Sequence, residues 1–177
     1  MFDPTAFENI KVVIEGEIYD RDLSGEIKVV DRNDWINSAK LSRKYEICFT
    51  VSGYNEKEIA ATLTLEAGLE NLSAELLGSG GANPLAGCIV DISFSLLLRK
   101  EVQVYQSIQE ELEDIWGKER EIVQSLQVSP LAESEWIKNN ARVSFNRLVY
   151  EEQIDDLTEM IDYMIDSLNK LKKLLAE

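Results

Sequence analysis

Five segments in the first hundred residues alternate apolar and polar side chains with a period of two, which is the pattern of half-buried β-strands. In the last of them, Val90, Ile92 and Phe94 share one face, opposite Asp91 and Ser93. Clean alternation and short connections are typical of antiparallel sheets with one packed face and one solvated face. The sequence therefore predicts an antiparallel sheet of about five strands over residues ~9–98. The predicted strands are residues 10–19, 26–30, 44–52, 58–66 and 88–99.

Helical spacing dominates the rest of the chain. Residues 102–126 carry an apolar stripe that Gly117 interrupts, and residues 131–150 fit either a strand or a continuing helix. A short helix over residues 69–77, ended by Gly78, also fits, although alternation there is compatible with a strand. The prediction is one α+β domain over 1–177, mainly β in 1–100 and mainly helical, with two or three helices, in 101–177.

The C-terminal segment has the strongest helical pattern. Its apolar residues alternate spacings of three and four, which makes a coiled-coil-like heptad seam. Such a seam can pack on the chain's own sheet or on its 102–126 helix, and its narrow stripe favours a helix over a sheet surface. It can also pair with a second copy and form a homodimer, and the sequence leaves packing within the chain and pairing between chains open. The seam residues are Ile154, Leu157, Ile161, Met164, Leu168, Leu171 and Leu175.

The charge of the chain restricts its partners. It carries 33 acidic and 18 basic residues, for a net charge of −15. Nucleic acids and anionic membrane surfaces bind through Lys and Arg, and the basic residues of 136–150 (Lys138, Arg142 and Arg147) are sparse, so neither is expected as a partner. No signal-like apolar run is evident, and the two cysteines do not make a disulfide framework, so a cytoplasmic protein is expected.

The stretch DRDLSGEIKVVD, residues 20–31, resembles the calcium loop of the EF-hand family. Asp20, Asp22, Ser24 and Asp31 fall at ligand positions, and Gly25 falls where that loop turns sharply. The resemblance implies a Ca²⁺ or Mg²⁺ site. The flanking segments alternate as strands do, however, so the favoured interpretation is a β-hairpin that turns at Asp20–Gly25, with an ion site at its tip as the alternative.

Catalytic residues are hard to find in this sequence. Histidine is absent, which excludes His-based nucleophile systems and His-ligated zinc. Cys48 is expected as a packing residue within a strand. The glycine-rich stretch 77–87 lacks the lysine of a phosphate loop, which favours a connector. No cofactor is therefore expected, apart from the Ca²⁺ or Mg²⁺ alternative.

These features together predict a non-enzymatic protein-interaction or assembly module. Its partner would be itself or another protein, with oligomerisation through the C-terminal helix. Two alternatives remain: a divalent-cation-binding protein that uses the Asp20–Asp31 loop, and an enzyme that uses carboxylates in a pocket between the sheet and the helices.

Overall fold

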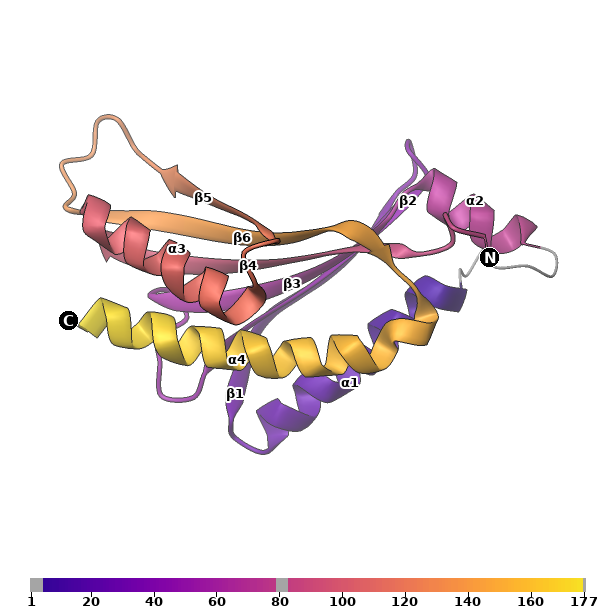
Figure 1. The fold of residues 1–177 in the computed structure, drawn as a ribbon, viewed down its shortest axis with the longest axis horizontal. Coiled ribbons are helices and arrows are strands. Elements are labelled where there is room, and N and C mark those ends of the chain that lie inside the picture. Colours follow the sequence, from indigo (N-terminus) through magenta and orange to yellow (C-terminus); the bar gives the residue numbers. More distant parts are fainter. Residues whose placement is uncertain (1–4, 79–82, 177) are drawn as a thin grey trace.

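The computed structural model describes residues 5–78 and 83–176. It has an α+β fold whose six strands form one antiparallel sheet in the order β1-β2-β3-β4-β6-β5 (Figure 1). The predicted α+β class with an antiparallel sheet is therefore confirmed, with six described strands rather than about five and four described α-helices rather than two or three. The elements are α1 (Thr5–Leu23), β1 (Ile27–Asn37), β2 (Ser42–Val51), β3 (Ile59–Ala67), α2 (Leu69–Leu77), β4 (Cys88–Arg99), α3 (Val102–Trp116), β5 (Glu121–Gln127), β6 (Trp136–Val149), the 3-10 turn η1 (Glu151–Gln153) and α4 (Ile154–Ala176).

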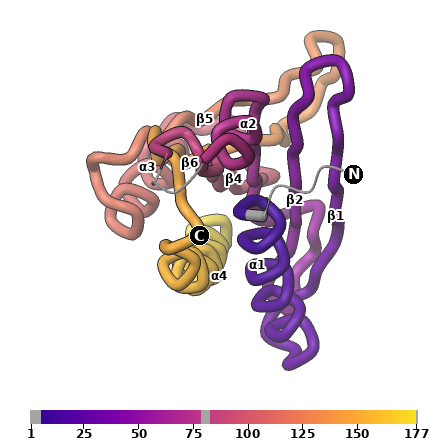
Figure 2. Tube along the Cα trace, turned by 90° about the vertical axis from the view of Figure 1, so that its right-hand side faces the viewer, coloured from indigo at the N-terminus to yellow at the C-terminus, as the bar shows by residue number. Residues whose placement is uncertain are grey.

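Three helices cover one face of the sheet, and no described helix covers the other, which we call the uncovered face (Figure 2). Helices α1, α4 and α3 lie side by side under the strands, whereas α2 sits at one end of the sheet (Figures 1 and 2). The core lies between the sheet and these helices, where alternate strand residues such as Ile47, Leu63 and Ile92 are fully buried. Many residues on the uncovered face are small, as in the cross-strand row of Cys48, Thr62 and Ser93.

The first predicted strand is wrong, because residues 10–19 belong to helix α1. Ile10, Ile14 and Ile18 are fully buried, whereas Val12 is 57% exposed. Isoleucines four residues apart lie on one side of a helix, so the same residues satisfy both a period of two and a helical period. The expected hairpin at Asp20–Gly25 is wrong for the same reason: these residues form the last turn of α1 and its link to β1.

The second half of the chain is less helical than predicted. Helix α3 ends at Trp116 and is capped by Gly117, whose φ of 94° lies in the left-handed region and whose N–H donates to the carbonyl of Glu113. Val123 and Leu126, expected on the helix, lie on strand β5 instead. Strand β6 takes up most of residues 131–150 and pairs with both β4 and β5. The short helix expected at 69–77 is confirmed as α2.

The heptad seam of α4 lies within the core of its own chain. Leu157, Ile161, Met164, Leu168 and Leu171 are buried against the sheet and the neighbouring helices, and Ile154 and Leu175 are partly buried beside them. Ile165, outside the seam, is also buried, so the apolar stripe is wide enough for a sheet surface. The Trp116 indole of α3 donates to Ser167 Oγ at 3.0 Å and so ties α3 to α4. A coiled-coil pairing with a second chain at this seam would have to displace the core.

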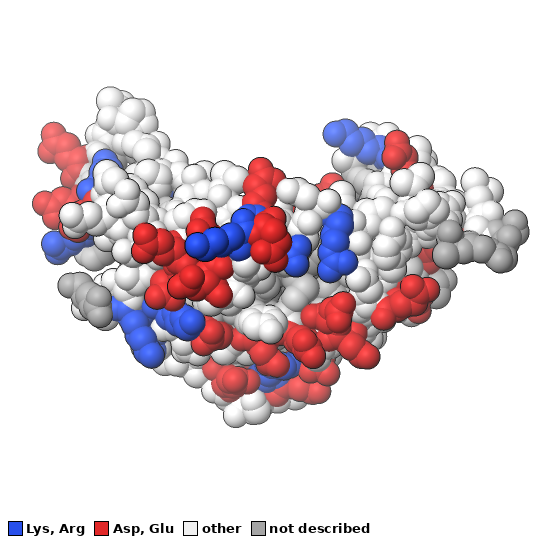
Figure 3. All heavy atoms as spheres, viewed as in Figure 1, with Lys and Arg blue, Asp and Glu red and all other residues white. Residues whose placement is uncertain are grey.

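None of the described helices is both long enough and apolar enough to cross a membrane. Acidic side chains are spread across the helical layer and the middle of the molecule (Figure 3).

Candidate protein-interaction surface

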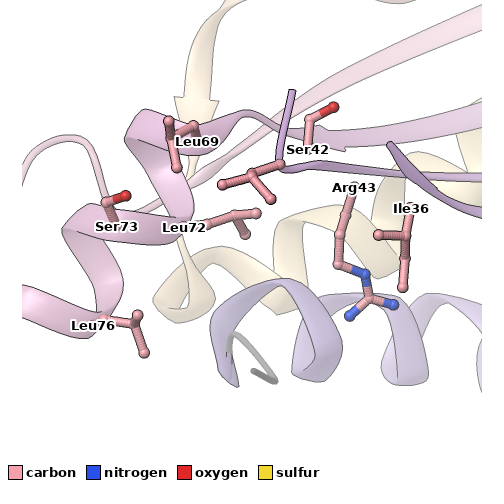
Figure 4. A pocket seen from close by; sticks show the side chains of 8 residues that line it. Ile36, Ser42, Arg43, Leu69, Leu72, Ser73 and Leu76 are labelled. Carbon is pink, nitrogen blue, oxygen red and sulfur yellow. The ribbon is translucent and has the colours of Figure 1, made fainter. Parts of the chain in front are cut away.

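An apolar groove lies where α2 faces the hairpin that joins β1 to β2 (Figure 4). Its volume of about 430 Å³ lies within the usual range of ligand-binding pockets. We call it the leucine groove. It is lined by Ile36, Leu41, Ser42, Arg43, Leu69, Leu72, Ser73 and Leu76.

Helix α2 forms one wall of the leucine groove. Leu69, Leu72 and Leu76 are three and four residues apart, so they lie on one side of the helix. Leu72 is buried, but Leu69 and Leu76 are 50% and 54% exposed. The helix start is fixed by Asn71, whose side-chain oxygen accepts the N–H of Gly68 at 2.9 Å. Two leucines are thus held in the solvent by an ordered helix.

The β1–β2 hairpin forms the opposite wall. Ile36 and Leu41 are 73% and 57% exposed, although large aliphatic side chains are usually buried. Leu41 has a φ of 51°, a left-handed conformation that costs a residue other than glycine on the order of 1–3 kcal/mol. The turn before it is held by Asn37, whose side-chain oxygen accepts the N–H groups of Ala39 and Lys40, both at 3.1 Å. The hairpin therefore keeps Leu41 at the groove despite an unfavourable backbone conformation.

Arg43 contributes its aliphatic stem to the groove while its charge is compensated elsewhere. Its guanidinium lies over the Phe7 ring, 4.7 Å from the centroid, and donates to Glu8 at 2.9 Å and to Asp34 at 3.2 Å. Lys11 pairs with the same two carboxylates. The groove is consequently almost wholly apolar even though an arginine lines it.

The pKa values of this ion network reflect the pairing. Burial alone would raise the pKa of the Glu8 and Asp34 carboxyls, but hydrogen bonds and the nearby charges of Lys11 and Arg43 outweigh it, so both pKa values are lowered. Burial likewise opposes the charged form of Lys11, whose pKa is nevertheless raised by the two carboxylates. All four groups are therefore charged at neutral pH.

The chemistry of the groove suits apolar side chains rather than catalysis. Among its described lining residues, the uncharged polar ones are Ser42 and Ser73. Exposed apolar patches of this kind usually mark sites that bind proteins or apolar ligands.

The two thiols lie elsewhere, in strands β2 and β4, and burial raises the pKa of Cys88 to about 12 and also raises that of Cys48. Both cysteines are neutral at pH 7, so neither is a ready nucleophile.

The residues of the predicted ion site lie at the end of α1 and on β1, where several have protein partners. The Asp22 carboxylate accepts the Val29 N–H at 3.2 Å, and Ser24 Oγ donates to the carbonyl of Arg21 at 2.9 Å. The Asp31 carboxylate accepts from the Arg32 N–H and the Asn33 side-chain amide, both at 2.9 Å. Asp20, the remaining residue of the predicted site, lies in the last turn of α1. Among residues 5–78 and 83–176, no three His, Cys, Asp or Glu side chains are grouped to hold a metal ion. The ion site at Asp20–Asp31 stays a prediction that calorimetry with Ca²⁺ and Mg²⁺ can test.

Sequence reasoning missed the leucine groove because its two walls are far apart in the chain. Ile36 and Leu41 belong to the first hairpin, and Leu69 and Leu76 belong to α2. One available signal was the ENLSAELL run, where a nine-residue helix carries more leucines than its one buried side needs. Part of the glycine-rich stretch after it, residues 79–82, lies outside the described residues.

No protein-family model, curated protein or solved structure matches this chain.

Proposed function

We propose that this protein is a non-enzymatic protein-interaction module that binds an apolar segment of another protein in the leucine groove. One observation carries the proposal: large aliphatic side chains that are at least half exposed converge on a single groove, in a chain of which 29% is charged. Those side chains are Ile36, Leu41, Leu69 and Leu76.

The shape of the groove favours an amphipathic helix or a short apolar peptide as the ligand. A helix on one side and a hairpin on the other leave a cleft into which side chains at positions i, i+3 and i+4 of a bound helix can insert. The walls are ordered before binding, since Asn71 and Asn37 fix the local backbone of α2 and of the hairpin turn. Preorganised walls reduce the entropy lost when a ligand binds.

Charge restricts the partner further. With a net charge of −15, the chain repels acidic proteins at long range and attracts basic ones, which mainly affects the rate of association. A neutral or basic segment with an apolar side is therefore the expected ligand. The seam of α4 is buried in the chain's own core, so the interaction is proposed for the leucine groove rather than for that helix.

The test compares a groove variant with a control variant of the same chemistry. Leu76→Glu places a charge in the groove, whereas Leu23→Glu places one at the end of α1, where Leu23 is already 84% exposed. Each variant and the native chain are used to capture proteins from a lysate of the source organism, with quantitative mass spectrometry, and to bind an environment-sensitive hydrophobic dye. We expect Leu76→Glu to lose both signals and Leu23→Glu to keep them.

A folded Leu76→Glu variant that captures the same proteins as the native chain contradicts the proposal. A further variant without residues 1–4, which lie outside the described residues, asks whether the chain's own N-terminus competes for the groove. Stronger dye binding by that variant, lost again when Leu76→Glu is added, would assign the groove to self-occupation rather than to a partner.

A further inference from the structure

Strand β5 is an edge of the sheet, and among residues 5–78 and 83–176 it pairs with β6 alone. It forms its ladder with β6, from Glu121 opposite Ser144 to Gln127 opposite Lys138. Five of its seven residues are exposed and none is buried. The N–H and C=O groups of its other side are therefore available to a further strand.

Beyond the charge of Glu121 at its start, this edge lacks the usual protection against pairing. Exposed edge strands are normally blunted by lysines, prolines or bulges. Between Glu121 and Glu133 the sequence has eleven residues without a charge, IVQSLQVSPLA, and its one proline lies beyond the end of β5. Val123, Leu126 and Val128 are 43%, 41% and 56% exposed.

We propose that β5 pairs in antiparallel fashion with β5 of a second copy of this chain, which joins two sheets into one. The register with β6 places Val123, Ser125 and Gln127 on the uncovered face, and Ile122, Gln124 and Leu126 on the helical face. A two-fold axis that runs through Gln124 normal to the sheet places the helical faces of the two copies on the same side of the joined sheet. It sets Ile122 opposite Leu126 of the second copy on the helical face, and Val123 opposite Ser125 on the other.

A second copy fits this edge better than an unrelated strand because the sequence of β5 is complementary to itself. Each apolar residue of the helical face meets another apolar residue, and Glu121 meets an uncharged glutamine, so no like charges face each other. Two chains of net charge −15 repel each other on average, and this uncharged edge lets their backbones approach with the least repulsion.

The strand is already ordered for pairing. The side chain of Gln124 donates to the carbonyl of Tyr105 at 2.8 Å and to the Gln109 side chain at 3.2 Å, both on α3, and accepts from Asn139 at 3.0 Å. These bonds hold β5 to α3 and β6, so little conformational entropy is lost when a second strand adds. The leucine groove involves β1 and β2 at the opposite side of the sheet, so this dimer leaves both grooves open and does not depend on the proposed function.

The test measures the mass of the full chain by sedimentation equilibrium and light scattering over a wide concentration range. Val123→Lys adds a charge on the exposed face of the edge, and Asn140→Lys adds the same charge on the same face of β6, one strand further in. We expect a dimer for the native chain and for Asn140→Lys, and a dissociation constant at least about tenfold higher for Val123→Lys. Ser125→Glu repeats the test if Val123→Lys does not fold.

Hydrogen exchange supplies an independent readout, because amide protection in β5 should rise with protein concentration only if a second strand pairs there. A monomeric mass for the native chain at millimolar concentration overturns the proposal. So does a dimer that both Val123→Lys and Ser125→Glu leave unchanged. A monomer whose β5 amides are protected only in a complex with another protein would assign the edge to a foreign strand and also overturn it.

Discussion

The two edges of the sheet, β1 and β5, have opposite characters. Strand β1 carries Lys28, Asp31, Arg32 and Asp34 within eleven residues, and its register with β2 shifts between Val29 and Asp31. Strand β5 carries no charge after its first residue and pairs with β6 without a shift. Charges and bulges are the common means by which proteins prevent edge-to-edge association. One edge is thus protected against pairing and the other is not, which indicates that pairing is avoided at β1 and available at β5.

The helices that flank the two edges hold them in different ways. Helix α1 is tied to β1 by ion pairs, from Lys11 to Asp34 and from Glu15 to Arg32. Helix α3 is tied to β5 by the neutral hydrogen bonds of Gln124. Ion pairs respond to pH and salt much more strongly than neutral hydrogen bonds do. A change of pH or salt should therefore alter the local stability of β1 more than that of β5.

The largest effect is expected from the core that both edges share. Ile161 of α4 is fully buried under the sheet, and Ile161→Ala should lower the free energy of unfolding by about 2–5 kcal/mol. The exposed Glu159→Ala, on the same helix, serves as the control. Because one core supports the whole sheet, hydrogen exchange should speed up in β1 and β5 together. Faster exchange at one edge alone would mean that the edges unfold independently.

A smaller and local loss is expected when the ion network beside β1 is broken. Arg43 is largely buried and joins Glu8 and Asp34, so Arg43→Met leaves two carboxylates with one cation fewer. We expect a loss of about 1–3 kcal/mol, the usual cost of removing a partner from a largely buried charged hydrogen bond. Exchange should speed up in β1 more than in β5. Arg142→Met, at an exposed position of β6, is the matched control, and equal changes in the two edges would contradict a local role for the network.

The sequence correctly predicted the elements in which the spacing of apolar residues fits only one kind of secondary structure. The pattern of β4 alternates cleanly because one of its faces packs and the other does not, and the leucines and isoleucines of α4 repeat only as a helix can. The strand prediction for residues 10–19 was wrong because a set of apolar side chains at every second position also contains side chains at every fourth position, as on one side of a helix. Only the tertiary contacts of Ile10, Ile14 and Ile18 decide between strand and helix.

The site was less predictable than the fold. The leucine groove depends on a hairpin and a helix separated by more than twenty residues, and no local pattern reports that they meet. Strand β5 looked helical because Val123 and Leu126 continue the spacing of α3 beyond Gly117. Its unprotected edge becomes evident only when the strand order places it last in the sheet.

Acid should loosen β1 before β5. The pKa values of Glu8 and Asp34 are lowered in the folded chain, so these groups bind protons more weakly when folded than when unfolded. Their stabilising contribution is present above their unfolded pKa values, about 4.5 and 3.8, and is lost as the pH falls through the lower folded values. Exchange protection factors of β1 should therefore decline below about pH 4 relative to those of β5. In Glu8→Gln/Asp34→Asn this relative decline should largely vanish, and its persistence would assign the acid response to other groups.

The smallest effect is expected from the exposed ion pair of Arg32 with Glu15. Arg32→Thr should change the free energy of unfolding by no more than about 1 kcal/mol, because exposed ion pairs lose most of their attraction to solvent screening and side-chain entropy. The denaturant midpoint in low and high salt measures this loss, which should shrink as salt is added.

The Arg32→Thr substitution also removes one of the charges that protect the β1 edge. Lys28, Asp31, Asp34 and the bulge remain, so the mass of the variant should equal that of the native chain. If this single change allowed β1 to self-associate, the protection of that edge would reside in one residue rather than in the combination of charges and bulge that distinguishes it from β5.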